Sequence, residues 1–444
     1  MESFLNDIQP EKIFKNLSSK KEAFWIRAGE RRALALFHAA AARVPAYKDF
    51  LKKHHIRPGV IRTIQDFRKV PPVTKKEYLR AYPLTALLWD GAFGDKAVTF
   101  AATSGSSGTP FYFPRDEALD LQSSIFHEMF LNSSSRGRAR STLVIDCFGM
   151  GVWIGGIITY QAFRKIALRG YPLSVITPGI NKKEIFEAVR TVGPLFEEII
   201  LCGYPPFIKD IIDEGKEHGI AWKKFPIRFV FAAESFGDNF RDHVARAVGM
   251  KEPALDSTNI YGTADLGTMA QETPLSIALR SKLLRNKKLF SSLFGSIEKT
   301  PTLAQFNPLF VNFESVDGSI LCTGYNALPL IRYEVGDRGG IFAYTDLVER
   351  FGKMPGIKRY LGPELPFVYV YERSDFAVKL YGAIIYPEHV RDALVHYSAE
   401  AGITGKFFLA VRHDAEENEY LEVNIELSKG FLRSDDLEGE IANI

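Results

Sequence analysis

Residues 103–110 read Thr103-Ser104-Gly105-Ser106-Ser107-Gly108-Thr109-Pro110, so every residue before the proline is a threonine, a serine or a glycine. Apolar segments lie on both sides, at 97–102 and at 111–113, and each is predicted to be a β-strand. Glycine lets the backbone approach a ligand closely, and successive N–H groups in such turns bind anions. The pattern therefore indicates a polyphosphate-binding loop between two strands.

This loop differs from the P-loop, which ends in Gly-Lys-Ser/Thr and runs into a helix. No lysine follows Thr109, and Pro110 with two aromatic residues after it favours an extended exit. A Ser/Gly-rich surface linker has the same composition. Phosphate binding is favoured over that alternative because a linker between apolar strands of one domain is less natural.

The bulk composition is typical of a soluble globular protein, with 46% hydrophobic and 25% charged residues. A length of 444 residues predicts two or three domains. The formal net charge of +3 gives no general attraction to nucleic acid, so none is expected as a partner.

The cysteines Cys147, Cys202 and Cys322 are far apart and include no CxxC pair, which argues against a disulfide framework and a zinc site. A reducing cytoplasm is therefore the expected location. Residues 1–7 carry acids where a signal peptide has a basic start. The uncharged segment 147–160 is too short to cross a bilayer.

Hydrophobic periodicity changes along the chain. Residues 1–65 are predicted to be a helical lead-in, rich in good helix formers. From 97 to about 345, strands alternate with amphipathic helices, which predicts βαβ units and parallel sheet. Short strands dominate after about 310, including separate ones at 331–333 and 340–344.

The predicted fold class is α/β. A large N-terminal domain of layered sheets and helices is expected over 1–372, with a β-rich subdomain at about 310–372. A small α+β domain is expected over 373–444.

Two short motifs place acids near the ends of predicted strands. Tyr261-Gly262-Thr263-Ala264-Asp265 follows a strand, and a carboxylate beside a hydroxyl there suits Mg²⁺ against phosphate. Asp265 as a helix N-cap is the alternative. Asp337, in a predicted turn after the strand at 331–333, suits ribose hydroxyls, and an ordinary Gly-Asp turn is the alternative.

Other reaction classes have little support. Gly149-x-Gly151-x-x-x-Gly155 nearly matches a dinucleotide fingerprint, but its spacing is off by one and no acid occurs between Asp146 and Glu184. A tight turn or a wall of a substrate pocket is favoured. No HExxH zinc motif and no GxSxG nucleophile elbow occurs, so a metal or serine hydrolase is not expected.

In combination, the motifs resemble the adenylate-forming superfamily of acyl-CoA synthetases and adenylation domains, on its phenylacetate–CoA ligase-like branch. The resemblance runs from about residue 65 to the end of the chain. It rests on the loop 103–110, the motif 261–265, the segment 328–337, and a hinge motif with Arg373, Ser374 and Asp375.

The resemblance implies ATP and Mg²⁺ as ligands, and coenzyme A as the expected co-substrate. Asp265 would hold Mg²⁺, and Asp375 would be the hinge between the two domains. The residues implied to bind nucleotide are Thr103, Ser104, Gly105, Ser106, Ser107, Gly108, Thr109, Ala233, Glu234, Ser235, Tyr261, Gly262, Ala264, Asp337 and Arg373. The residues implied in catalysis are Thr263, Asp265, Arg373 and Asp375. Phe148, Trp153 and Tyr204 would border the acid.

The chain departs from the family pattern at several positions. Asp265 stands where Glu is usual, and Ala264 replaces Ser or Thr. The family uses a lysine near the end of the small domain for adenylation, but no lysine follows Lys429. These features lead us to expect a C-terminal domain that is truncated.

Residues 274–299 are basic and apolar, with Glu298 as the one acid. A basic amphipathic helix is typical of contact with an anionic membrane surface or an acidic partner. A partly solvated cover over the nucleotide site is the alternative, and it is favoured because charge runs are usually solvated faces.

The predicted activity is ATP-dependent, AMP-forming activation of a carboxylic acid, aryl or apolar, followed by transfer to coenzyme A. Two alternatives stay open: transfer to a protein or polysaccharide acceptor, and a nucleotide-binding protein without turnover. The resemblance also implies a homodimer.

Overall fold

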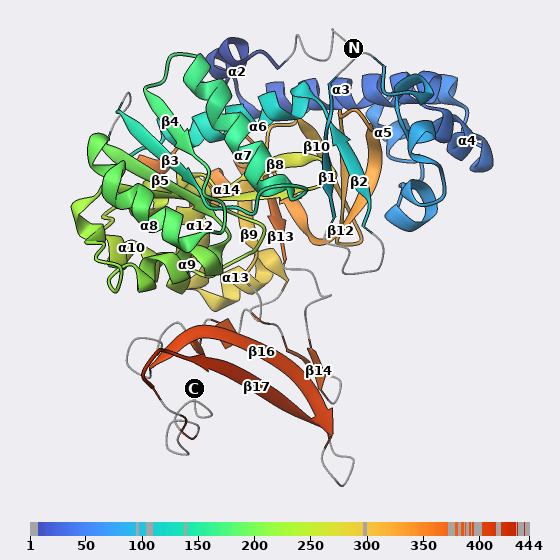
Figure 1. Ribbon diagram of the computed structural model, residues 1–444. Coiled ribbons are helices and arrows are strands. Elements are labelled where there is room, and N and C mark those ends of the chain that lie inside the picture. Colours follow the sequence, from blue (N-terminus) through green and yellow to red (C-terminus); the bar gives the residue numbers. More distant parts are fainter. Residues whose placement is uncertain are drawn as a thin grey trace.

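The computed structural model describes residues 8–94, 97–103, 110–136, 140–295 and 300–371, together with parts of 378–439. These parts of 378–439 are residues 378–380, 383–385, 387, 390–391, 393–394, 402–413, 419–431, 433 and 439. Figure 1 shows a large mixed sheet covered by helices, with two C-terminal hairpins beneath it in the view. The α/β fold class predicted from the sequence is confirmed.

One sheet of eleven strands organises the described chain, in the order β10-β11-β12-β13-β9-β8-β7-β6-β5-β3-β4. Neighbouring strands from β4 to β7 are parallel. This parallel half contains β3 (Thr142–Asp146), β4 (Leu173–Ile176), β5 (Glu198–Gly203), β6 (Ile227–Ala232) and β7 (Ser257–Thr263). Helices cover both faces of this half, which explains why β3, β5 and β6 read as nearly continuous apolar runs.

The other half of the sheet is antiparallel. It contains β8 (Gly267–Gln271), β9 (Thr302–Gln305), β10 (Val311–Val316), β11 (Ser319–Gly324), β12 (Leu330–Phe342) and β13 (Phe367–Val370). The long strand β12 pairs with β11 along its first part and with β13 along its last four residues. The β-rich region after residue 310 is thereby hydrogen-bonded into the large sheet.

The prediction of two short strands at 331–333 and 340–344 with a turn between them was wrong. Residues 330–342 form one strand, and Asp337 lies within it. Gly336 and Asp337, which suggested the turn, lie where the register with β11 shifts between the pairs Leu321–Glu334 and Ser319–Arg338, and Gly336 has φ +95°. Gly339 has a different role, because a Cβ there would lie 1.9 Å from the carbonyl oxygen of Tyr369 on β13. Glycine is needed there for close strand pairing.

Two helical layers sandwich the parallel strands. On one face lie α6 (Glu117–Asn132) and α7 (Ile154–Leu168), whose Phe130, Phe163 and Ile166 pack against the sheet. On the other face lie α8 (Lys182–Thr191), α9 (Pro205–Glu214) and α10 (Asp238–Val248). The small helix α11 spans Pro253–Asp256 and precedes β7.

The N-terminal region is helical, as the sequence predicted. It contains α2 (Pro10–Leu17), α3 (Glu22–Arg43), α4 (Pro45–Lys53), α5 (Ile64–Phe67) and the short turns η1 (Pro58–Val60), η2 (Lys75–Leu79), η3 (Leu84–Leu87) and η4 (Trp89–Gly91). Helix α3 ends at Arg43 because the next residue, Val44, precedes Pro45 and is extended, as residues before proline usually are. A Cβ at Gly29 would lie 2.4 Å from the Cβ of Pro308, so glycine lets α3 pack closely there.

The basic segment expected over 274–299 forms α12 (Pro274–Leu284) and α13 (Lys287–Phe294), while residues 296–299 lie outside the described part. Leu279, Leu283 and Phe290 are buried in a cluster with α14 (Tyr344–Phe351) and β9. Arg280 is 1% exposed and pairs with Glu272 and Asp238, each at 2.9 Å. The main apolar side chains of this segment therefore serve the protein core.

The C-terminal part contains two hairpins, β14 (Val378–Leu380) with β15 (Ala383–Ile385), and β16 (Ile403–His413) with β17 (Glu419–Leu427). Polar contacts connect β16 to α9: Lys406 Nζ lies 3.0 Å from Asp210 Oδ2, and Lys209 Nζ donates to the Thr404 carbonyl at 3.0 Å. Among the described helices, none has both the length and the apolar character needed to span a bilayer.

Candidate nucleotide and acid site

The predicted polyphosphate loop connects the two strands of a hairpin. β1 (Thr99–Ala102) pairs antiparallel with β2 (Tyr112–Arg115). Thr103 closes the base of the loop twice, because its N–H donates to the Phe111 carbonyl and its hydroxyl accepts the Phe111 N–H, both at 3.1 Å. The tip, Ser104 to Thr109, lies outside the described residues. The hairpin thus orients a loop whose own geometry stays a prediction.

The glycine-rich turn after β3 meets this hairpin. The Ala102 N–H donates to the Val152 carbonyl at 2.9 Å. Trp153, the N-cap residue of α7, is next in the chain and is 49% exposed. The base of the predicted phosphate loop therefore lies against the segment predicted to border the acid.

The acid-bordering residues gather where the strand order reverses. The chain passes from β3 to β4 at the sheet edge and then returns to β5 on the other side of β3. Open α/β sheets bind ligands outside the carboxyl ends of strands at such a switch point. Phe148 follows β3 and is buried, while Tyr204 follows β5 and is 42% exposed. Adjacent strands thus present Phe148 and Tyr204 at the same edge.

The predicted adenine and ribose residues touch. The Tyr261 hydroxyl donates to Asp337 Oδ2 at 2.6 Å, across 76 residues of sequence. Burial raises the pKa of Tyr261 well above its ordinary value, and the Asp337 carboxylate adds to this shift. The phenol therefore stays protonated as a donor. Its ring also stacks on Phe313 of β10, with the ring centroids 6.2 Å apart.

Asp265 lies in the turn between β7 and β8 and is 5% exposed. Its carboxyl contributes to the raised pKa values of Tyr261 and of Cys322, as does that of Asp337. Both acids therefore belong to one electrostatic cluster. One carboxylate with substrate phosphates is an arrangement that suits Mg²⁺, so the chemistry of Asp265 fits the implied metal. The described residues contain no group of three or more His, Cys, Asp or Glu that could hold a metal by themselves.

The neighbours of Asp265 shape the turn. The Thr263 hydroxyl accepts the Leu266 N–H at 3.2 Å, which gives it a role in holding the turn. Gly262 is needed because a Cβ there would lie 2.6 Å from the Gly267 carbonyl oxygen. Ala264 packs against the largest apolar cluster.

Residues 233–235, which are predicted to line adenine, follow β6 and are held by contacts with β7, β9 and the C-terminal part. Asn259 Nδ2 of β7 donates to the Glu234 carbonyl at 3.0 Å, and Ser235 Oγ lies 3.0 Å from Thr302 Oγ1 of β9. Arg391 from the C-terminal part forms an ion pair with Glu234. Ala233 has φ +80°, a left-handed conformation that is strained for a residue with a side chain.

Sequence reasoning missed Asn259, Thr302 and Arg391, since nothing in their local sequence marks them. It also missed Asp146, a carboxyl with no exposed surface at the end of β3. The sequence signal that could have identified Asp146 is an acid within the otherwise apolar run 143–147. Arg373 and Asp375, implied by the hinge motif, lie outside the described residues.

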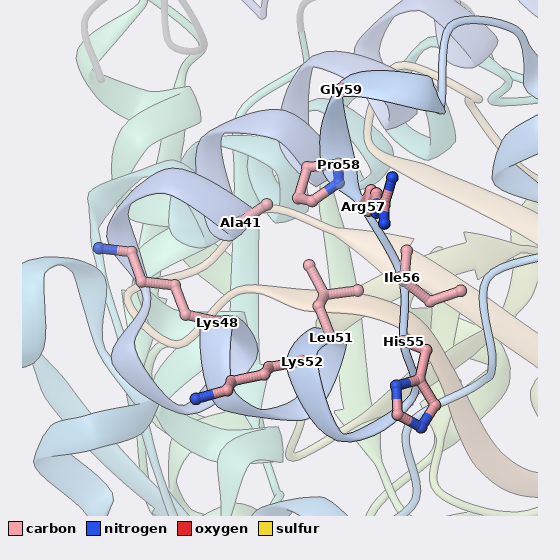
Figure 2. A pocket seen from close by; sticks show the side chains of 9 residues that line it. All are labelled: Ala41, Lys48, Leu51, Lys52, His55, Ile56, Arg57, Pro58 and Gly59. Carbon is pink, nitrogen blue, oxygen red and sulfur yellow. The ribbon is translucent and has the colours of Figure 1, made fainter.

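An open cavity of about 550 Å³ lies far from these residues in sequence, beside α4 and η1 (Figure 2). Apolar side chains, including Leu51 and Ile56, line its middle, and basic side chains lie around them. The cavity-lining residues are Ala41, Lys48, Leu51, Lys52, His55, Ile56, Arg57, Pro58 and Gly59. None of the predicted site residues is among them, so this cavity carries no part of the site.

The fold defines the class of protein. The chain superimposes on 2-hydroxyisobutyryl-CoA ligase in a postadenylation state with an acyl-AMP bound, with a TM-score of 0.67, 14% identity, and coverage of 94% of this chain and 81% of that one. An open conformation of that ligase, with 2-hydroxyisobutyryl-AMP and CoA bound, gives a TM-score of 0.61 at 14% identity, covering 97% and 91%. The chain has the adenylate-forming ligase fold.

The sequence comparison agrees with the predicted phenylacetate–CoA ligase-like branch. A phenylacetate-coenzyme A ligase from Thermus thermophilus is 23% identical over 242 residues, which are 53% of this chain. The matched region spans about half of that relative, 49% of its length. No family model matches the chain. The predicted resemblance to the adenylate-forming superfamily, on its phenylacetate–CoA ligase-like side, is confirmed.

Proposed function

We propose that the protein activates a carboxylic acid with ATP, forming an acyl-adenylate, and then transfers the acyl group to coenzyme A. The observation that carries this proposal is the hydrogen bond between Tyr261 and Asp337. The residues around Asp337 suggested ribose binding, the family resemblance gave Tyr261 a place near adenine, and the fold joins these two motifs across 76 residues of sequence. The 2-hydroxyisobutyryl-CoA ligase structures with acyl-AMP and CoA bound support the same reaction.

The nucleotide would bind along the edge formed by β6, β7 and β12. Tyr261 would stack near adenine, the segment 233–235 would line the base, and Asp337 would accept hydrogen bonds from the ribose hydroxyls. Ser104 to Thr109 would surround the β- and γ-phosphates, with Thr103 at the base of the loop. Asp265 would hold Mg²⁺, which when bound neutralises phosphate charge. Arg373 and Asp375 keep their proposed roles beside the ribose and at the hinge.

The acid would enter between Phe148, Trp153 and Tyr204. Its carboxylate oxygen attacks the α-phosphorus of ATP, a P–O bond forms, and the bond to the β-phosphate oxygen breaks with release of pyrophosphate. The coenzyme A sulfur then attacks the acyl carbon, the thiol proton is lost and AMP leaves. The protein contributes mainly by positioning the reactants and by stabilising the phosphate charge. The hydrogen bond from Ala102 to Val152 links the phosphate loop to the acid segment.

Pyrophosphate release by the full chain tests the proposal. Mg·ATP is supplied with pooled aryl, short-chain and long-chain carboxylates, first without and then with coenzyme A. Release that depends on one pool, and thioester formation with coenzyme A, are expected. Asp337→Asn should abolish both, whereas Asp346→Asn, at an exposed position on α14, should change neither.

The other outcomes identify the alternatives. Pyrophosphate release without thioester formation would replace coenzyme A by a protein or polysaccharide acceptor. ATP binding without release from any pool would favour a nucleotide-binding protein without turnover. Failure to bind ATP would overturn the proposal and both alternatives together.

The proposal includes a cytoplasmic location, because Cys147, Cys202 and Cys322 are unpaired, buried thiols. Burial raises the pKa of each thiol. A small-molecule acid is the proposed partner. A homodimer and the lack of nucleic-acid binding stay predictions.

A further inference from the structure

Asp146 is a buried carboxyl that the proposed reaction does not use. It is the last residue of β3, and its relative exposure is 0%. Oδ1 accepts the Phe148 N–H at 3.1 Å. Oδ2 is also buried and has no hydrogen-bond partner among the described residues. A buried polar group without a partner is costly, so its retention calls for a reason.

The position of Asp146 in the fold points to a ligand. The residue ends β3 beside β5, at the switch point of the sheet, and its partner in register is Cys202. Because side chains alternate along a strand, Asp146 shares a face with Val144, which packs under α7. Phe148, two residues further on, is the buried member of the predicted acid-binding set.

The surroundings of the carboxyl are apolar and favour its neutral form. Burial raises the pKa of Asp146 to about 8, against a smaller opposite effect of the Phe148 N–H. The neighbouring titratable groups are the thiols of Cys147 and Cys202, whose pKa values are also raised by burial. Near neutral pH the carboxyl is therefore mostly protonated, and it can both donate and accept a hydrogen bond.

We propose that Asp146 determines specificity within the acid pocket, where its free oxygen hydrogen-bonds a hydroxyl or amino substituent on the body of the acid. This inference rests on the proposed function and names the substrate class: an acid whose apolar body carries one polar group. A buried polar partner discriminates strongly against an analogue that lacks the matching group, because the partner is then left unpaired.

The alternative is that Asp146 only shapes the turn after β3. An Asp side chain that accepts the N–H two residues on is a common local turn. Asparagine preserves this acceptor, whereas valine removes it. The two substitutions therefore separate a turn from a ligand contact.

The test compares acids that differ only in one substituent. The probes are para-methyl, para-hydroxy- and para-aminophenylacetate, and heptanoate with omega-hydroxy- and omega-aminohexanoate. Binding to the full chain is measured by calorimetry, and kcat/KM by pyrophosphate release. We expect wild type to prefer one polar acid over its methyl partner by about tenfold or more, and Asp146→Val to abolish that preference while binding the methyl acid as well as wild type.

Asp146→Asn identifies the substituent. If the substituent is a hydroxyl, the Asp146→Asn protein should keep the preference for the polar acid, because an amide can also hydrogen-bond a hydroxyl. If the substituent is an ammonium group, the variant should lose that preference, because an ammonium group needs the carboxylate. Thr142→Val, at the other end of β3, is the matched control and should keep the wild-type preference. ATP affinity should be unchanged in all three variants, which shows that the fold is intact.

Two results would overturn the inference. One is a wild-type protein that does not discriminate between polar and methyl acids, and the other is an Asp146→Val protein that keeps the discrimination. Because calorimetry reads acid binding directly, either result stands even where no pyrophosphate is released. Acid activation without polar preference would leave the proposed function standing and reject the inference alone.

Discussion

At the scale of single residues, the hydrogen bond between Tyr261 and Asp337 links two segments that the chain keeps apart. Tyr261 lies near the end of β7, and Asp337 lies in the long strand β12 in the antiparallel half of the sheet. A hydrogen bond to a charged group is worth about 1.5–3 kcal/mol. We therefore expect this pair to hold the Asp337 carboxylate, which is proposed to bind ribose, in one orientation.

Removal of the Tyr261 hydroxyl tests this expectation. Tyr261→Phe keeps the ring that stacks on Phe313 but leaves Asp337 without this donor. ATP affinity measured by calorimetry should fall by about tenfold, in line with the loss of a hydrogen bond to a charged group. Tyr420→Phe, at an exposed position on β17, is the control. Unchanged affinity in Tyr261→Phe would show that the pair plays no part in nucleotide binding.

A second prediction concerns the pH dependence of stability. Because the pKa of Asp146 is raised from 3.8 to about 8 in the folded protein, the folded state binds its proton more tightly than the unfolded state. The protonated Asp146 carboxyl therefore adds to the free energy of unfolding. This contribution is fully present below pH 3.8 and is lost as the pH rises to about 8. Relative to Asp146→Asn, wild type should lose up to ~1.4 kcal/mol per pH unit in that window.

Urea denaturation of both proteins at several pH values between about 5 and 8 measures this difference. The neighbouring thiols of Cys147 and Cys202 do not titrate in this window, because burial raises their pKa values. A difference between the two proteins that stays constant with pH would mean that Asp146 is ionised in the folded state.

At the scale of elements, glycines decide how closely strands and turns approach. The β7–β8 turn brings the Gly267 carbonyl against Gly262, while β12 brings Gly339 against β13. In the sequence these glycines look like loop residues. Their actual function is to let two backbones pair at short range.

Gly262→Ala should therefore destabilise the protein. The new Cβ would lie 2.6 Å from a backbone oxygen that cannot swing away. Overpacking of this kind costs about 1–3 kcal/mol, measured as a lower free energy of unfolding in urea. Gly59→Ala is a matched control, because nothing lies within 4 Å of its Cβ position. Equal stabilities would show that the β7–β8 turn adjusts without cost.

At the scale of the whole molecule, polar contacts connect the C-terminal part to the segment after β6 and to helix α9. Arg391 pairs with Glu234 in the predicted adenine segment, and their side chains are 14% and 8% exposed. Lys406 and the Thr404 carbonyl contact α9, the helix whose N-cap residue is Tyr204. The C-terminal part is thus bonded to the predicted nucleotide segment and to α9, the helix that follows Tyr204.

Loss of these contacts should release the C-terminal hairpin. In the double variant Arg391→Ala/Lys406→Ala, hydrogen exchange should accelerate in β16 and stay unchanged in β3, because a largely buried ion pair and a second pair are removed. Arg412→Ala is the control, since its pair with Glu422 lies within the hairpin. Faster exchange in β3 as well would indicate general destabilisation.

The sequence by itself determined the local elements and the motifs they carry. Apolar runs bounded by turn residues mark buried strands, and on that basis the sequence predicts strands at 143–147, 199–203 and 227–232. The structure has them at 142–146, 198–203 and 227–232. The loop 103–110 and the motifs that contain Asp265 and Asp337 were predicted from local sequence in the same way. Such signals depend on neighbours within a few residues, which the chain itself supplies.

Only the tertiary structure decided which of these segments meet. Hydrogen bonds join distant parts of the chain, from Ala102 to Val152 and from Tyr261 to Asp337. Residues 233–235 are likewise held by contacts with Asn259, Thr302 and Arg391. Strand order and register determine these contacts, and neither can be predicted from the composition of a short segment. The continuity of β12 and the burial of Asp146 were likewise decided by packing, because a neighbouring strand or helix determines whether a glycine bends the chain and whether a carboxyl reaches water.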